Sequence, residues 1–90
     1  MYKFTASERF WKHFNKLTER QKERANKTFE IFKRNPFDSR LRAHKINSLS
    51  ASYGKTVYAA DVEADLRVVF YIEGNVVYTL DIGSHKIYRP

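Results

Sequence analysis

Hydrophobic residues recur with two different periods along this chain, and the change of period near Pro36 restricts the fold more than any other feature. Before Pro36, Phe10, Phe14 and Leu17 recur at helical spacing. After residue 40, short segments rich in Val, Ile, Tyr and Thr are separated by turn residues at 63–65 and 73–75. The sequence therefore predicts an α+β fold, with an N-terminal helical hairpin packed on a four- or five-stranded antiparallel sheet.

The ends of both predicted helices carry recognisable signals. Ser7 is a good N-cap for the first helix, and Thr18 with Gln21 matches the capping-box pattern at the start of the second. Asn35-Pro36 ends the second helix, because Pro36 cannot continue a helix and Asn tolerates a left-handed cap. The cations Lys12, Lys16, Arg20, Arg24 and Lys27 are then expected on the outward faces of the hairpin.

The second half contains most of the predicted strands. We expect strands over residues 1–5, 40–46, 56–62, 66–72 and 76–82, and a Ser-rich loop over residues 47–55.

Strand alternation assigns residues to the two faces of the sheet. Leu66, Val68, Phe70 and Ile72 are expected to meet the helices, so Arg67 points to the opposite face. On the strand predicted over residues 40–46, Leu41 and Ala43 suit the core. Arg42 and His44 are therefore also expected on the opposite face of the sheet, which no predicted helix covers. The predicted core contains Trp11 and five phenylalanines, Phe10, Phe14, Phe29, Phe32 and Phe70.

The length of 90 residues corresponds to one domain spanning 1–90. The absence of cysteine excludes a disulfide scaffold, a thiol nucleophile and thiolate zinc sites. Because no apolar run approaches the ~18 residues of a membrane span and the first ten residues lack the apolar core of a signal peptide, we expect a cytoplasmic protein with no membrane partner.

The positive charge is concentrated in the first half of the chain. The whole chain carries a formal charge of +7, whereas residues 1–45 alone, with thirteen Lys/Arg and five Asp/Glu, carry +8. This asymmetry indicates a polyanionic partner, with nucleic acid first, an acidic protein second and a membrane surface third. A basic helix pair that is merely solvated is the alternative.

The residue types also limit the chemistry. The three histidines, His13, His44 and His85, are far apart in sequence and lack a second ligand at helical spacing, so no metal cofactor is predicted. The remaining Arg, His, Lys and Tyr side chains are the types that a metal-free ribonuclease needs for proton transfer and for stabilising a phosphorane. In the purely structural alternative, Arg67 pairs with Asp61 or Asp81 across strands and His44 is a surface residue.

Three segments, LRAHKI at 41–46, DLRVVF at 65–70 and DIGSHKIY at 81–88, resemble in order and spacing the RelE/ParE superfamily of bacterial type II toxin–antitoxin toxins. The resemblance implies a helical hairpin followed by a meander, and a small antitoxin partner with an acidic or amphipathic segment. RelE-like members cut mRNA without metal, usually in the ribosomal decoding site, whereas ParE-like members poison DNA gyrase and have no nuclease residues.

The resemblance also implies roles for individual residues. Arg67 matches the arginine that contacts the scissile phosphate, and His85 and His44 match histidines of mRNA-cleaving members. Tyr88 lies near the C-terminal aromatic residue of RelE-like enzymes, one residue closer to the histidine than is usual there. The neighbouring cations predicted to bind RNA are Arg42, Lys45, Lys86 and Arg89.

The function predicted from the sequence is thus a toxin that acts as a metal-independent mRNA endoribonuclease, inhibits translation and is neutralised by an acidic antitoxin. A ParE-like gyrase inhibitor without nuclease activity, and a non-catalytic relic that only binds its antitoxin or nucleic acid, remain the alternatives.

Overall fold

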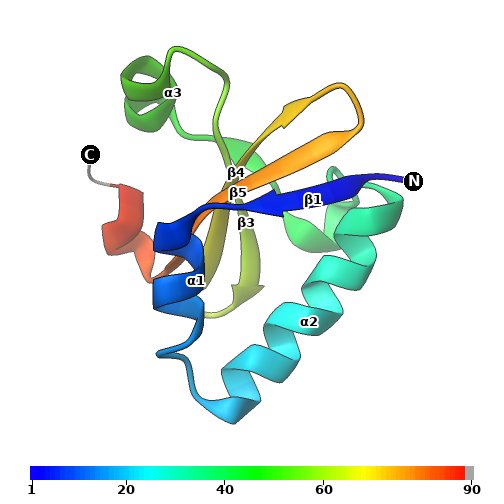
Figure 1. The fold of residues 1–90 in the computed structure, drawn as a ribbon, viewed down its shortest axis with the longest axis vertical. Coiled ribbons are helices and arrows are strands. Elements are labelled where there is room, and N and C mark those ends of the chain that lie inside the picture. The colour runs from blue at the N-terminus through cyan, green and yellow to red at the C-terminus, as the bar shows by residue number, and fades with distance from the viewer. Residues whose placement is uncertain (89–90) are drawn as a thin grey trace.

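The computed structural model describes residues 1–88 of the chain (Figure 1). The elements in chain order are β1 (Lys3–Ala6), α1 (Glu8–Phe14), α2 (Glu19–Arg34), the 3-10 helix η1 (Ser39–Leu41), β2 (His44–Lys45), α3 (Asn47–Tyr53), β3 (Tyr58–Glu63), β4 (Leu66–Glu73), β5 (Val76–Gly83) and the 3-10 helix η2 (His85–Tyr88).

The five strands form one sheet in the order β1-β5-β4-β3-β2. The predicted antiparallel meander is confirmed for β3, β4 and β5. The first strand differs, because β1 pairs with β5 in parallel, so that the sheet is mixed. A parallel neighbour is allowed here because the helices and three strands separate β1 from β5 along the chain and supply the long connection that parallel pairing needs.

The helical hairpin begins where the capping signals predict. The Ser7 side chain accepts a hydrogen bond from the Phe10 amide at 3.0 Å. Thr18 and Gln21 form both hydrogen bonds of the capping box at the start of α2. The second helix ends at Asn35 as predicted, but the cap is extended (φ −160°) and not left-handed. Within residues 1–88, the non-glycine residue with a left-handed backbone is Arg42 (φ 52°).

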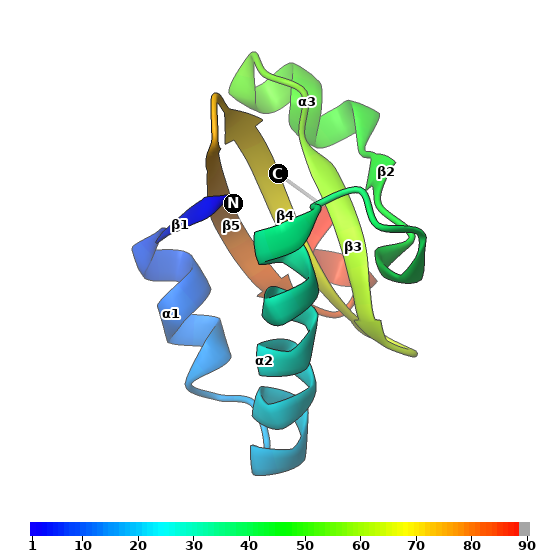
Figure 2. The ribbon, with the colours of Figure 1, turned by 90° about the vertical axis from the view of Figure 1, so that its right-hand side faces the viewer.

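Buried side chains cover both faces of the sheet. On one face, Phe10 of α1 and Ala25 and Phe32 of α2 pack against strand residues that include Val68 and Phe70. Figure 2 shows α1 and α2 on this side of the sheet and η2 on the other. The predicted alternation of Leu66, Val68, Phe70 and Ile72 toward the helices is confirmed.

Three details of the sequence prediction are wrong. The segment predicted as a loop at 47–55 contains α3, which buries Leu49 and ends at Gly54 in the left-handed region (φ +66°). The predicted strand at 40–46 is reduced to the two residues of β2, because η1 and the left-handed Arg42 turn the chain first. The opposite face of the sheet is therefore covered in part, by α3 and η2, through a second cluster that includes Leu49, Val57, Val69 and Ile87.

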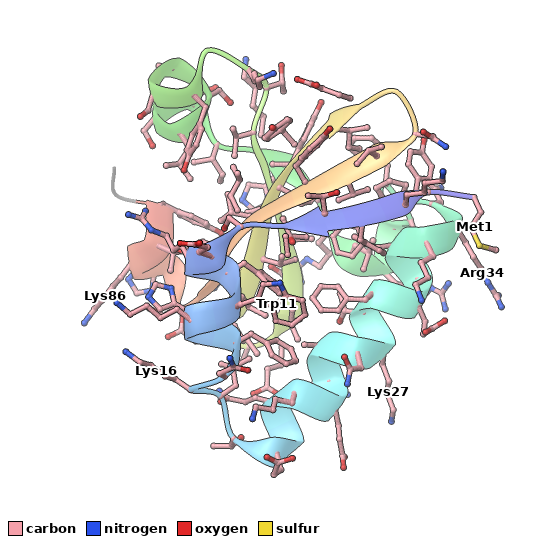
Figure 3. All side chains as sticks on the ribbon, viewed as in Figure 1. Met1, Trp11, Lys16, Lys27, Arg34 and Lys86 are labelled. Carbon is pink, nitrogen blue, oxygen red and sulfur yellow. The ribbon has the colours of Figure 1, made fainter. Side chains whose placement is uncertain are left out.

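Trp11 is also misplaced in the sequence prediction. It lies on the side of α1 toward α2 but is 52% exposed (Figure 3), whereas Phe10, Phe32 and Phe70 are buried and Phe14 and Phe29 are half-buried. The reason is helix geometry, since adjacent residues 10 and 11 cannot both point into the same core.

None of the helices within residues 1–88 combines the length and the apolar composition needed to cross a membrane.

Candidate active site at the end of the sheet

A row of paired residues across three strands forms the base of the candidate site. Asp61 of β3 lies opposite Arg67 of β4, and Arg67 lies opposite Gly83 at the end of β5. His85 begins η2 two residues after Gly83, and Asp65 stands in the turn between β3 and β4. The topology therefore places the turn residue, the arginine and the histidine at one end of the sheet.

Arg67 is held by two carboxylates. Its Nε lies 3.4 Å from Asp61 Oδ1 and its NH1 lies 3.4 Å from Asp65 Oδ1. The side chain is 24% exposed, so part of the guanidinium still faces solvent. Of the two partners considered in the structural alternative, Asp61 is the one that pairs with Arg67, whereas Asp81 pairs with His13.

Arg42 supplies a second guanidinium to the same carboxylate. Its Nε lies 3.5 Å from Asp61 Oδ2, and its side chain is 79% exposed. The left-handed backbone at Arg42 redirects the chain between η1 and β2. Asp61 thus bridges two arginines, which places two donors of the kind that bind phosphoryl oxygens next to each other.

His85 is connected to the arginines through Asp65. Its Nδ1 lies 3.3 Å from Asp65 Oδ1, and the ring is largely exposed. The hydrogen bond from His85 lowers the pKa of the Asp65 carboxyl, and the positive charge of Arg67 lowers it further. Because an ionised carboxylate can only accept, Nδ1 carries the proton and Nε2 is the ring nitrogen left for a substrate.

His44 is fixed by a different acceptor. Its Nδ1 donates to the backbone carbonyl of Arg42 at 3.1 Å. A carbonyl oxygen can only accept, so this contact also places the proton on Nδ1 and leaves Nε2 as the basic nitrogen of the neutral ring. The His44 ring meets the Tyr88 ring edge to face, with centroids 6.5 Å apart.

Tyr88 connects η2 to α3 and to the site. The Ser48 hydroxyl of α3 donates to the Tyr88 carbonyl at 3.4 Å. The Tyr88 hydroxyl is buried and has no hydrogen-bond partner within residues 1–88. Burial raises the pKa of this phenol, whereas the nearby positive charge of Arg67 opposes that change.

The structure thus brings together Arg67, His85, His44, Tyr88 and Arg42 from the predicted set. Lys45 follows His44 on β2 and is exposed. Lys86 is exposed and lines a hollow together with residues of α1. Arg89, also predicted to bind RNA, lies outside the described residues.

Sequence reasoning did not assign Asp61 and Asp65 to the site. A usable signal was present for Asp65, which is two residues before Arg67 and therefore on the same side of the extended chain. For Asp61 the signal was its place as the single charged residue of the strand predicted over residues 56–62.

Within residues 1–88, no group of three or more His, Asp or Glu side chains is arranged to hold a metal ion.

Comparison with known proteins finds similarity in structure only. No family model matches the sequence, and no curated protein matches it either. Among solved structures, YafQ from E. coli strain BL21(DE3) superposes with a TM-score of 0.76 at 16% identity over 100% of both chains. The YoeB/ParE toxin from Agrobacterium tumefaciens has a TM-score of 0.74 at 16% identity and covers 92% of this chain and 98% of its own.

A third solved structure contains a second protein. The archaeal RelE-RelB complex from Pyrococcus horikoshii OT3 superposes with a TM-score of 0.73 at 15% identity over 92% of this chain and 93% of that chain. Over nearly its whole length, this chain has the fold of the RelE, YafQ and YoeB/ParE toxins.

Proposed function

We propose that this protein is the toxin of a type II toxin–antitoxin pair and acts in the cytoplasm as a metal-independent mRNA endoribonuclease that inhibits translation. The observation that carries the proposal is the convergence of Arg67, His85, His44 and Tyr88 at one end of the sheet. Three contacts support this convergence: Asp65 joins Arg67 to His85, Asp61 joins Arg67 to Arg42, and Tyr88 packs on His44.

In this mechanism the RNA supplies its own nucleophile. The 2′-oxygen attacks the adjacent phosphorus as its proton leaves, a pentacovalent phosphorane forms, and the bond to the 5′-oxygen breaks as that oxygen gains a proton. Arg67 and Arg42 donate to the non-bridging oxygens, where negative charge develops. Asp61 keeps the two guanidiniums side by side before the substrate binds.

We assign the two proton transfers to the histidines. His44 presents a basic Nε2 when neutral, which suits removal of the 2′-proton. His85 donates from Nδ1 to the Asp65 carboxylate, and in its protonated form it delivers a proton from Nε2 to the leaving oxygen. Tyr88 orients His44 through its ring contact.

The test is cleavage of translated mRNA by Arg67→Ala and His85→Ala, each first shown to be folded by circular dichroism. Loss of a single charge-stabilising donor lowers rates by about 10²–10³-fold in other enzymes, and we expect Arg67→Ala to fall in that range. Arg20→Ala removes the same charge from the hairpin surface and serves as the matched control. Folded site variants that cleave like wild type would remove both residues from the mechanism.

The ParE-like alternative has one specific observation in its favour, the structural similarity to a YoeB/ParE toxin. The same experiment separates the two functions. If wild type leaves translated mRNA intact and instead stalls DNA gyrase, the ribonuclease proposal is wrong.

We further propose an acidic antitoxin as the protein partner. The solved RelE-RelB and DinJ-YafQ complexes support a second protein partner. The exposed cations of the hairpin, Lys12, Lys16, Arg20, Arg24 and Lys27, supply charge complementary to an acidic segment. Next to them, Phe4, Phe10, Trp11 and Phe29 line a hollow of about 240 Å³ that an apolar side chain would fill.

Co-elution of the toxin with a neighbouring acidic gene product at low salt tests this partnership. We expect a stable complex that weakens when Trp11 is replaced by Asp, because the substitution places a carboxylate at the apolar hollow. Separate elution at low salt would overturn the partnership.

A further inference from the structure

A hollow at the surface lies outside the candidate active site. It has a volume of about 740 Å³ and is lined by Glu8, Arg9, Lys12 and His13 of α1, Asp81 of β5, and Lys86 and Ile87 of η2. Residues of both α1 and η2 line this hollow, although the two elements lie on opposite faces of the sheet (Figure 2). The hollow forms because β1 pairs with β5 only as far as Thr79, which leaves the last part of β5 open to α1.

A histidine–aspartate pair forms the floor of this hollow. His13 Nδ1 lies 2.5 Å from Asp81 Oδ1, and the Asp81 side chain is only 11% exposed. The same oxygen accepts a hydrogen bond from the Ile82 amide at 2.8 Å. The negative charge of Asp81 is therefore already bound by two donors, and the Nε2 side of the His13 ring, 38% exposed, is left for a ligand.

Three cations surround this pair. Arg9, Lys12 and Lys86 line the hollow, and none of them forms an ion pair with another residue of 1–88. Glu8 is the one lining carboxylate besides Asp81. With Asp81 occupied by His13, three unpaired cations face one free carboxylate, and the hollow favours an anion.

The position of η2 connects this hollow to the active site. His85 and Lys86 are consecutive, yet His85 contacts Asp65 in the active site while Lys86 lines the hollow. One single-stranded polyanion that crosses η2 would meet both places in succession. A single strand of nucleic acid carries a phosphate at every nucleotide and so supplies an anion to both places, whereas an acidic peptide does so only where its carboxylates have that spacing.

We infer that the hollow between α1 and η2 is a second phosphodiester-binding site, in which Arg9, Lys12, His13 and Lys86 hold the RNA backbone beside the nucleotide that is cleaved. This inference rests on the proposed ribonuclease function and adds a subsite to it. In its protonated form His13 donates from Nδ1 to Asp81 and from Nε2 to a phosphate oxygen. Asp81 positions that ring and does not touch the RNA.

The test uses a fluorescein-labelled 12-nucleotide RNA whose riboses are all 2′-O-methylated, so that it binds but cannot be cleaved. Fluorescence anisotropy gives its Kd between 50 and 200 mM NaCl for wild type, for Lys12→Gln/Lys86→Gln and for the control Lys3→Gln/Arg34→Gln. The control removes the same total charge from exposed positions that do not line the hollow. A polyglutamate peptide of equal length is titrated in parallel.

We expect the Lys12/Lys86 variant to bind the RNA more weakly and to lose about 0.7 from the slope of log Kd against log salt for each phosphate contact removed. The control should retain the wild-type slope. Equal slopes for the two variants would overturn the subsite, and so would a loss confined to the polyglutamate titration, which would assign the hollow to an acidic protein.

Failure of the subsite proposal can be distinguished from failure of the proposed ribonuclease function. If wild type cleaves translated mRNA while the Lys12/Lys86 variant binds RNA like the control, only the subsite is wrong. If wild type neither cleaves mRNA nor binds the RNA, both proposals are wrong.

Discussion

At the scale of single residues, the site is built from polar groups that restrain one another. Asp61 and Asp65 hold Arg67 from two sides, and Asp65 also holds His85. Each carboxylate limits the positions of a cation without burying it fully. In the proposed reaction a substrate phosphate takes the place of one of these carboxylates as the partner of Arg67.

Replacement of Tyr88 by Phe separates stability from function at this site. The Tyr88 hydroxyl is buried without a partner in residues 1–88, and an unpartnered buried polar group is destabilising. We expect Tyr88→Phe to leave the free energy of unfolding unchanged or to raise it by up to about 1 kcal/mol. Urea denaturation followed by circular dichroism measures this change.

Cleavage of mRNA by Tyr88→Phe tests whether the aromatic ring of Tyr88 is sufficient for its proposed role. Because the role proposed for Tyr88 depends on its ring contact with His44, Tyr88→Phe should retain most of the mRNA cleavage, and Tyr88→Ala should lose it. A Phe variant as inactive as the Ala variant would instead assign the hydroxyl itself to the reaction.

The contact between Asp38 and Arg40, which lies outside the candidate active site, predicts that the free energy of unfolding depends on pH. The Arg40 side chain donates to the Asp38 carboxylate from Nε and NH2, and the Arg40 amide donates as well. These bonds lower the pKa of Asp38 from 3.8 to about 2. Because the pKa of Asp38 is lower in the folded state, its ionised carboxylate stabilises the fold fully above pH 3.8. This stabilisation is lost as the pH falls through about 2.

Asp38→Asn should therefore flatten the fall in unfolding free energy across that interval. Because Asp38 lies at the surface, the effect is small. Glu23→Gln is the control, since the exposed Glu23 side chain forms no ion pair within residues 1–88. Urea titrations at a series of acidic pH values measure it. Identical acid profiles for Asp38→Asn and wild type would contradict the prediction.

At the scale of elements, η2 determines the position of the proposed catalytic groups. It carries His85 and Tyr88 at the candidate active site and Lys86 at the hollow beside α1, and Ile87 packs against the second core cluster. Gly83 permits its close approach to β5, because a Cβ at that position would lie 2.8 Å from Ile87 Cγ2.

Gly83→Ala should displace η2 more than it unfolds the protein. The contact is with the end of a flexible side chain, so we expect a modest loss of stability, whereas a small misplacement of catalytic groups lowers cleavage by up to about 10²-fold. Gly74→Ala is the matched contrast. Its positive φ (+58°) with open space around it predicts a loss of about 1–2 kcal/mol without a change in cleavage by the folded protein. Equal effects of the two variants on cleavage would show that η2 does not position the site.

At the scale of the whole molecule, the sheet is stabilised from both faces, and its centre is Phe70. This ring is fully buried, meets Phe32 edge to face at 4.8 Å and stacks on Tyr58 at 5.6 Å. It therefore joins α2 to two strands. The second cluster, around Val69 and Leu49, covers the other face and supports the elements that carry His44 and Tyr88.

Phe70→Ala should lower the free energy of unfolding by about 3–5 kcal/mol, a large part of the stability of a small domain. Trp11→Ala is the control, because it removes a large aromatic side chain that is half-exposed. We expect it to lower the free energy of unfolding by less than about 2 kcal/mol. Circular dichroism in urea measures both, because Trp11 is the single tryptophan and its removal abolishes the fluorescence signal. Equal losses would mean that the assignment of the two faces is wrong.

The sequence by itself determined the elements whose signals are local. Ser7, Thr18 and Gln21 specify where the helices begin, because a cap is satisfied within one turn of its own chain. The alternation from Leu66 to Ile72 specifies which side chains meet the helices, and it places Arg67 on the other face. These features depend on neighbours only a few residues away, and all of them are confirmed.

Only the tertiary structure decided the arrangements that depend on distant partners. The parallel pairing of β1 with β5, the helix α3 over the second face and the exposure of Trp11 follow from which surfaces remain to be covered once the sheet has formed. The same holds for the pairs Asp65–His85 and His13–Asp81, whose members are 20 and 68 residues apart in sequence. No local pattern specifies such contacts, because the sheet and η2 must first bring the strand ends together.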